Sequence, residues 1–501
     1  MAKLFTNIGL VVIASVLTLF ALEGLTRAYL WGKDSFLLDR EISALAEAQG
    51  VSEASFNIYY LGGSTVRGVI PKVTIPEIVE YGLGGKVGGS PVRSVNLASD
   101  GKDLGYNLTR LKRIIKGKDE YRPSLVVIYS GHNEFLKYHR PSGKTMFSGA
   151  IGWLSEYSVL VEKLLAVFEP YRLELADRKF FDVPLLGPDA REDVIRQYQQ
   201  GLKEAVRELR ENRIPLVIST VAGNYADWQP NRSTFCADSP DRDEFALLMR
   251  NGQVATEQGR YSAAVSMYEQ ALALCDSFAE THYRLAGSYA AQREYDLAAQ
   301  EYLKATEYDA MPIRALPSMN DFIRNLARDE GVIHVDSISE IRKRSEKGLI
   351  GFDLMVDAHH PNKLGYIVIG QAIARAIGDA FDPGSYPAGV PDWQGAVDKF
   401  NLTREERFDV LIWNGRWLTR MATWRYDTTE RLERAERVFA EAMDLYPDRH
   451  EPYLGLAMVG FLKKNVATAQ GHLEKAREIN SDAVAAYLEQ PWVSDVVQSA
   501  R

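Results

Sequence analysis

Residues 57–68 read NIYYLGGSTVRG, an apolar run that ends in two glycines and Ser64. Short runs rich in apolar and β-branched residues and followed by loop residues predict the strands of a buried sheet. The same character recurs at 92–98, 124–131, 214–220 and 331–337. Helical patterns lie between these runs, for example at 104–115 and 191–212. Strands that alternate with helices predict an α/β fold, a parallel sheet covered by helices on both faces.

Polar residues follow four of the predicted strands, where the functional loops of a parallel sheet are found. Ser64 follows two glycines that allow a sharp turn, but a serine is a poor nucleophile unless a base removes its proton. Asp357 precedes His360 by three residues, which supplies a base and a carboxylate to hold it. Gly101 offers an unhindered backbone N–H and Asn133 a side-chain amide. A nucleophile, a base, a carboxylate and oxyanion donors are what acyl transfer from an ester requires.

The order of Ser64, Gly101, Asn133, Asp357 and His360 resembles the SGNH hydrolases, also called the GDSL family. The resemblance implies a flavodoxin-like three-layer α/β/α sandwich. It implies that Ser64 is the nucleophile, His360 the base and Asp357 its partner. It further implies an oxyanion hole formed by the backbone N–H groups of Ser64 and Gly101 and the amide of Asn133.

The resemblance covers residues 56–235 and 312–380 and includes two departures from the family pattern. Gly63 stands where the family has Asp, and Glu134 stands where it has a second Asp. Neither position is one of the functional residues named above, but the first change is expected to alter the loop and the substrate.

Alternatives remain for several residues near these motifs. His359 competes locally with His360 for the role of base, and His132 is interpreted as a turn residue. The apolar stretch 146–171 is either a lid over the site or an added helix, and the added helix is favoured. The mechanism requires no metal and no cofactor, and no group of His and carboxylates in the sequence indicates a metal site.

The chain between 242 and 308 is helical in pattern and repeats with a period of 34 residues. Gly259, Tyr261, Ala264, Tyr268 and Ala271 recur as Arg293, Tyr295, Ala298, Tyr302 and Ala305, and Ala435, Phe439 and Ala442 recur as Ala469, Leu473 and Ala476. Small alanines allow helices to approach closely, and the aromatic rings fill the groove between them. The pattern resembles the tetratricopeptide repeat.

The predicted organisation therefore has five parts. They are a membrane anchor at 1–30, the first part of the SGNH domain at 50–240, inserted repeats at 241–311, the second part of the SGNH domain at 312–385, and a C-terminal tetratricopeptide-like region at 390–501. The two inserted repeats are fewer than the three that usually fold alone, so they are expected to pack against the catalytic domain or the C-terminal repeats.

Residues 4–22 carry no charged side chain, and at about 1.5 Å per residue they nearly match a hydrocarbon core of about 30 Å. A cleaved signal peptide is the alternative to an anchor, and the anchor is favoured because no clear cleavage site follows. The net charge of −8 argues against a nucleic-acid partner. Cys236 and Cys275 either form one disulfide or are two unrelated thiols.

These features predict an esterase or O-acyltransferase anchored in a bacterial inner membrane, single-pass, with its catalytic domain in the periplasm. The expected substrate is an acyl ester, most simply an acetyl ester, of a polysaccharide or cell-wall glycan, or a small ester. The repeats are expected to recruit a protein partner. Two alternatives are an inert SGNH fold that serves as a scaffold for an envelope assembly, and a lipase or thioesterase.

Overall fold

The computed structural model describes residues 22–23, 36–138, 185–236, 241–384, 392–425 and 427–500. Residues 4–21 of the predicted membrane span and the whole stretch 146–171 lie outside the described residues. The predictions for these two segments therefore stay predictions.

In the described part of the chain, a six-stranded sheet forms the centre of the α/β domain. The strands are β1 (Phe56–Gly62), β2 (Lys86–Val87), β3 (Ser90–Asn96), β4 (Leu125–Tyr129), β5 (Leu216–Ser219) and β6 (Ile333–Val335). They lie in the order β2-β3-β1-β4-β5-β6, and Ile58 of β1 lies opposite Ser94 on one side and Leu125 on the other. Counted in chain order without β2, the strands follow the flavodoxin-like order 2-1-3-4-5.

The prediction of a wholly parallel sheet was wrong at one edge. Strand β2 pairs with β3 in the antiparallel sense, so the sheet is mixed. The physical reason is the turn at Gly88 and Gly89, which have φ values of 56° and 81°. Glycine adopts this left-handed conformation without a steric penalty, and the chain can therefore reverse directly into β3.

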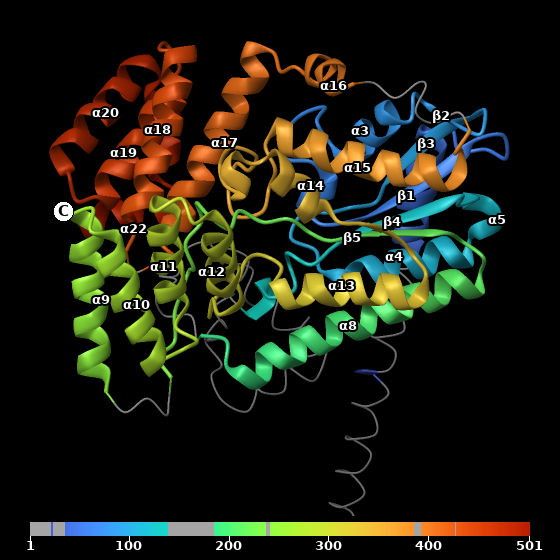
Figure 1. The fold of residues 1–501 in the computed structure, drawn as a ribbon. Coiled ribbons are helices and arrows are strands. Elements are labelled where there is room, and N and C mark those ends of the chain that lie inside the picture. The colour runs from blue at the N-terminus through green and yellow to red at the C-terminus, as the bar shows by residue number, and fades with distance from the viewer. Residues whose placement is uncertain are drawn as a thin grey trace, which may run out of the picture.

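Helices cover both faces of the sheet (Figure 1). One face carries α3 (Ile75–Gly82), α14 (Ser337–Arg344) and α15 (Lys363–Phe381), and the other carries α4 (Leu104–Lys116), α8 (Pro188–Glu211) and α13 (Pro317–Glu330). Successive residues of a strand point to opposite faces. Ile58 and Tyr60 accordingly belong to the first core, and Tyr59 and Leu61 to the second. The three-layer architecture is thus present.

Helix α15 is the one helix of the described residues that is long and apolar enough to cross a membrane. More than half of it is buried inside the protein, where it packs on α3 and on the sheet. Its apolar character is therefore that of a core helix.

The predicted central repeats form two helical hairpins. They comprise α9 (Arg242–Glu257), α10 (Tyr261–Leu274), α11 (Ala279–Ala291) and α12 (Tyr295–Glu307). The repeating alanines and tyrosines are buried between the helices, as Ala264 and Tyr268 illustrate. Gly259 and Arg293, one period apart, both have a positive φ, so the turn between the paired helices also repeats.

The C-terminal region is helical throughout its described residues. It contains α16 (Trp393–Lys399), α17 (Arg404–Ala422), α18 (Thr429–Leu445), α19 (Glu451–Leu462), α20 (Val466–Ile479), α21 (Ser481–Leu488) and α22 (Pro491–Ala500). Phe439, at a predicted repeat position, fits against Gly415 and Gly455, where any Cβ would collide with its ring. Lys464 takes the left-handed turn position that Gly259 and Arg293 hold in the central repeats.

The inserted repeats pack against the α/β domain, one of the two neighbours expected from their small number. Ala286, Ala298 and Tyr302 belong to the same buried cluster as the sheet residues Ile58 and Tyr60. The hydroxyl of Tyr283 donates a hydrogen bond to the carbonyl oxygen of Ala226 at 2.7 Å. The insert and the sheet therefore share one core.

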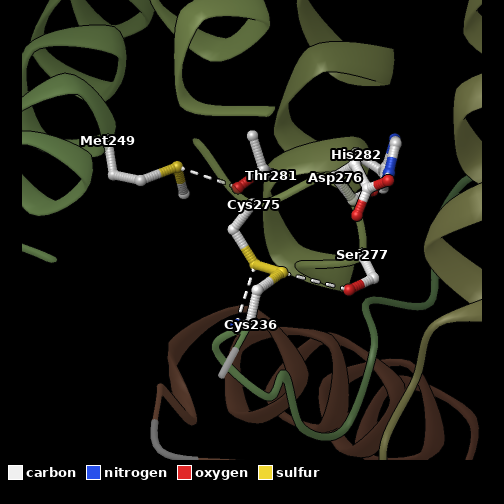
Figure 2. Close-up of a disulfide and its surroundings, with 7 residues drawn as sticks. All are labelled: Cys236, Met249, Cys275, Asp276, Ser277, Thr281 and His282. Atoms are coloured by element: carbon white, nitrogen blue, oxygen red, sulfur yellow. Dashed lines mark hydrogen bonds between the residues drawn. A yellow bond between two sulfur atoms is a disulfide. The ribbon is translucent and has the colours of Figure 1, made fainter. Parts of the chain in front are cut away.

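The two cysteines, left open by the sequence, form a disulfide between Cys236 and Cys275, whose Cα atoms lie 5.5 Å apart (Figure 2). Cys236 belongs to the loop that follows β5, and Cys275 ends α10. The bond therefore ties the second helix of the insert to the chain that enters it.

Replacing both cysteines by serine is expected to lower the free energy of unfolding by about 2–4 kcal/mol, because the open chain regains conformational entropy in the unfolded state. Denaturant unfolding of the variant and the native protein measures the difference. A reducing agent should destabilise the native protein to the same extent and leave the variant unchanged. Equal stability of the two proteins without reducing agent would contradict the prediction.

Candidate active site

The predicted site residues all lie at the carboxyl edge of the sheet. Ser64 starts the short helix α2 (Ser64–Arg67) directly after β1, Gly101 lies in the loop after β3, and Asn133 follows β4. Asp357 and His360 lie between β6 and α15. Because β3, β1 and β4 are neighbours in the sheet, their loops meet at the point where the strand order reverses. The fold thus brings together residues separated by almost 300 positions.

Ser64, His360 and Asp357 form a continuous chain of hydrogen bonds. Ser64 Oγ lies 2.7 Å from His360 Nε2, and His360 Nδ1 lies 2.6 Å from Asp357 Oδ2. The carboxylate of Asp357 is fully buried, and its Oδ1 accepts the backbone N–H groups of His359 and His360 at 2.9 and 2.8 Å. An ionised Asp357 can only accept, so Nδ1 of His360 carries the proton and Nε2 presents its lone pair to Ser64. This is the arrangement in which a histidine can act as the base for a serine.

The candidate oxyanion donors lie beside Ser64. Ser64, Gly101 and Asn133 line one cavity. Asn133 Nδ2 donates one hydrogen bond to the carbonyl oxygen of Lys102 at 3.0 Å, and the amide has a second N–H for a ligand.

Gly63 explains the first departure from the family pattern. A Cβ atom at this position would collide with Nδ2 of Asn133. The absence of a side chain at 63 is therefore what allows the amide of Asn133 to approach the serine turn.

The cavity around Ser64 has a volume of about 530 Å³. Its described lining consists of Ser64, Arg67, Gly68, Val69, Asp100, Gly101, Asn133, Leu136, Ile313, His359, His360, Trp413, Trp417, Met421 and Trp424. No role for the tryptophans follows from the sequence, because nothing in their spacing relates them to the motifs of Ser64 and His360. They come from α17 and the turn that follows it.

A second cavity, of about 670 Å³, lies between α3 and the segment that joins α16 to α17. Its lining includes Lys72 and Glu406, which form an ion pair at 2.6 Å across it. It is the larger of the two, but its lining residues include neither Ser64 nor His360. The site is therefore placed at the smaller cavity.

The rings of three histidines lie next to one another beside Ser64. The ring of His359 lies 4.1 Å from that of His360 and 4.8 Å from that of His132. Burial lowers the pKa of His132 to about 3 and holds the pKa of His359 well below its usual value, so both rings are neutral. His132 Nδ1 accepts the backbone N–H of Ala315 at 3.1 Å, which fits a turn residue. Because the hydrogen bond of Ser64 goes to His360, the geometry favours His360 over His359 as the base.

Asp357, His359 and His360 are the one group of described residues whose ligand atoms lie close enough together to hold a metal ion. Two of these three side chains are the ones joined to each other and to Ser64 by hydrogen bonds. The arrangement therefore suits proton transfer between them.

Glu134, the second departure, is a buried acid that joins two loops of the site. Its carboxyl oxygens accept the backbone N–H of Leu104, the first residue of α4, at 3.0 and 3.3 Å. The pKa of Glu134 is raised to about 8, chiefly because the side chain is buried and also because the charge of Asp103 is near. The side chain therefore links the Asn133 loop to the helix that follows the Gly101 loop.

Comparisons with known proteins fall into two groups. A family model described as a TPR repeat matches residues 252–293, and no curated protein matches the chain in sequence. The solved structures include a GDSL-like lipase from Bacteroides thetaiotaomicron with 13% identity and a TM-score of 0.32, over 68% of this chain and 98% of that one. They also include an acetylxylan esterase from Geobacillus stearothermophilus with 13% identity and a TM-score of 0.29, over 65% and 95% of the two chains.

A third solved structure is a TPR protein with an unusual peptide-binding site, with 14% identity and a TM-score of 0.16, over 50% of this chain and 94% of that one. Both kinds of protein that the sequence resembles therefore occur among the matches. The likenesses are remote, so the chemistry of the site has to follow from its own geometry.

Replacing Gly63 by alanine is expected to lower kcat by about 100-fold, because the new Cβ displaces the amide of Asn133 and removes one oxyanion donor. Steady-state hydrolysis of ethyl acetate measures the loss. Gly471→Ala makes the same chemical change on α20, where nothing lies within 4 Å of the added Cβ, and should retain full activity. Full activity of Gly63→Ala would show that Asn133 is not a donor.

Proposed function

We propose that this protein is a serine esterase or O-acyltransferase that acts on acyl esters, most simply acetyl esters, of a polysaccharide or cell-wall glycan. The observation that carries the proposal is the unbroken hydrogen-bond chain from Ser64 through His360 to the buried carboxylate of Asp357. The position of Asn133 and Gly101 on the same cavity supplies donors for the oxyanion.

In the first half of the reaction, Ser64 Oγ attacks the carbonyl carbon of the ester and its proton passes to Nε2 of His360. Asp357 stabilises the imidazolium that forms. The backbone N–H groups of Ser64 and Gly101 and the amide of Asn133 receive the negative charge of the tetrahedral oxygen. Each such donor is worth about 10²–10³ in rate. His360 then gives its proton to the leaving alcohol, and the acyl group remains on Ser64.

In the second half, water or a sugar hydroxyl attacks the acyl group on Ser64. His360 takes the proton of the attacking group and returns it to Ser64 Oγ when the acyl group leaves. Water gives hydrolysis, and a sugar hydroxyl gives transfer.

The alternative of an inert scaffold conflicts with the position of Asp357. This carboxylate is fully buried, and its hydrogen bonds hold the backbone and ring of His360. Burying a charge is costly, and an inert fold would have no use for one that orients a histidine toward a serine. The lipase alternative is separated from the proposal by comparing short with long acyl esters.

The inserted repeats are proposed to bind a protein partner. Paired antiparallel helices of this kind stack into a curved surface that suits an extended peptide or another helix. Since the insert shares its core with the sheet, the partner would be held next to the catalytic domain.

The proposed location is the outer face of a bacterial inner membrane, with residues 4–22 as a single-pass anchor. The uncharged character of that span supports an anchor. The disulfide between Cys236 and Cys275 supports an oxidising compartment such as the periplasm. Acetylated glycans of the cell envelope are found on the same side of the membrane.

A fluorophosphonate probe is expected to label the native protein at Ser64, because only an activated serine reacts with it. Ser64→Ala should abolish the labelling, and His360→Ala should reduce it at least 100-fold while the protein stays folded. Ser99→Ala, on the neighbouring loop, serves as the control and should label fully. Mass spectrometry of the labelled peptide identifies the site, and a label on any other residue would reject the assignment.

A reporter that is active only in the periplasm, fused after residue 501, is expected to give signal in cells. The fusion should remain in the membrane fraction after osmotic shock, because an uncleaved span holds it there. Release by osmotic shock would indicate a cleaved signal peptide. A silent periplasmic reporter with an active cytoplasmic one would reverse the proposed orientation.

A further inference from the structure

The cavity around Ser64 receives a second wall from the C-terminal helical region. Trp413 and Trp417 of α17 and Trp424 just after it line this cavity together with the catalytic residues. The rings of Trp413 and His360 meet edge to face, with centroids 5.6 Å apart. The wall is thus in contact with the base and not at a remote part of the cavity.

Trp417 has an unsatisfied polar group. Its indole N–H is buried and has no hydrogen-bond partner in the part of the chain that the structure describes. A buried donor without a partner costs about 1–3 kcal/mol, and such groups are rare in native proteins. Trp417 lines the cavity, so a rotation of its ring toward the cavity would let this N–H reach a hydroxyl of a bound ligand.

The rim of the cavity is charged. Arg67 and Asp100, both lining residues, form an ion pair there, and each side chain is more than half exposed. Guanidinium and carboxylate groups can donate to and accept from hydroxyl groups. The cavity therefore combines flat aromatic surfaces with polar groups at its mouth.

From these contacts we infer that Trp413 and Trp417 form a platform for a sugar ring, placed next to His360, so that the C-terminal region selects a glycan ester. The inference rests on the proposed function and specifies its substrate class. A sugar ring has an apolar C–H face that packs on an indole ring and hydroxyls that bind polar groups at its edge. A long acyl chain would use the aromatic wall but neither the indole N–H nor the charged rim.

Trp413 is the tryptophan that contributes least to the packing of α17. Trp413 and Trp417 are each only partly buried, but Trp417 packs against the apolar cluster in which Trp424 is buried. Trp413→Ala and Trp417→Ala are therefore the useful variants, and Trp417→Phe keeps a ring while removing the N–H. Trp492→Ala, on α22 and packed in a separate cluster, is the matched control.

The test compares kcat/KM for methyl 6-O-acetylglucoside with kcat/KM for ethyl acetate, which has no ring. Each alanine variant is expected to lower the ratio of the two values about 3- to 10-fold, chiefly through KM for the glycoside, because one aromatic contact is lost. Trp417→Phe should fall between the native protein and Trp417→Ala, and Trp492→Ala should leave the ratio unchanged. An unchanged ratio in Trp413→Ala and Trp417→Ala would overturn the inference. The same variants can be compared on a decanoate ester and ethyl acetate. If only that ratio of kcat/KM values falls, the wall binds an acyl chain, and the inference is overturned.

A binding measurement separates this inference from the proposed function. Calorimetry with the Ser64→Ala variant and methyl 6-O-acetylglucoside requires no turnover. Binding that weakens at least threefold on adding Trp413→Ala supports the platform, even if no ester is hydrolysed by the native protein. No binding by the Ser64→Ala variant would reject the platform, even if Ser64 is confirmed as the nucleophile.

Discussion

The loop 224–232, which follows β5, joins the α/β domain to the C-terminal region beside the candidate active site. Three buried arginines make this connection by binding the backbone of the loop. Arg314, Arg425 and Arg431 donate to the carbonyl oxygens of Asn224, Trp228, Gln229 and Pro230 and to the side chain of Asn231. Buried Asp309 accepts two backbone N–H groups of the same loop. Burying three guanidinium groups is costly unless their hydrogen bonds are made, so this junction holds only when all its partners are in place.

The contacts of this loop join the α/β domain, the inserted repeats and the C-terminal region, which are separate parts of the sequence. Arg425 and Arg431 come from the C-terminal region, and Arg425 also forms an ion pair with Glu280 of α11 at 3.2 Å. The loop they bind continues to Cys236, where the disulfide fixes the insert. Helix α17 ends just before Arg425, so the same contacts hold the tryptophans of α17 over the site. A change that loosens the junction would move this wall relative to His360 without touching the triad.

Local pattern was enough to predict five of the six strands, the central repeats and the position of Ser64, Gly101 and Asn133 after strands, whereas Asp357 and His360 lie after α14 and not directly after a strand as predicted. Each of these depends on the periodicity of a short segment, and the geometry joins Ser64 to His360 as the order of motifs predicted. The β2 hairpin was missed because a two-residue strand has no periodicity. The pairing of the cysteines and the wall containing Trp413 depend on distances between segments remote in sequence, which no spacing rule provides. The roles of Gly101 and Asn133 as donors stay predictions, as does the membrane anchor.

The proposed triad alone does not distinguish hydrolysis from transfer, since both reactions would use Ser64, His360 and Asp357 in the same way. The outcome depends on which hydroxyl is near His360 Nε2 while the acyl group is on Ser64. Water is abundant, so a sugar hydroxyl competes only if it is held in place, and well-oriented groups reach effective molarities of about 10⁵ M or more. The aromatic wall in contact with His360 offers a surface on which a sugar can be oriented next to the proposed base. For the proposed reaction, the choice between hydrolysis and transfer would therefore depend on α17 of the C-terminal region as well as on the catalytic motifs.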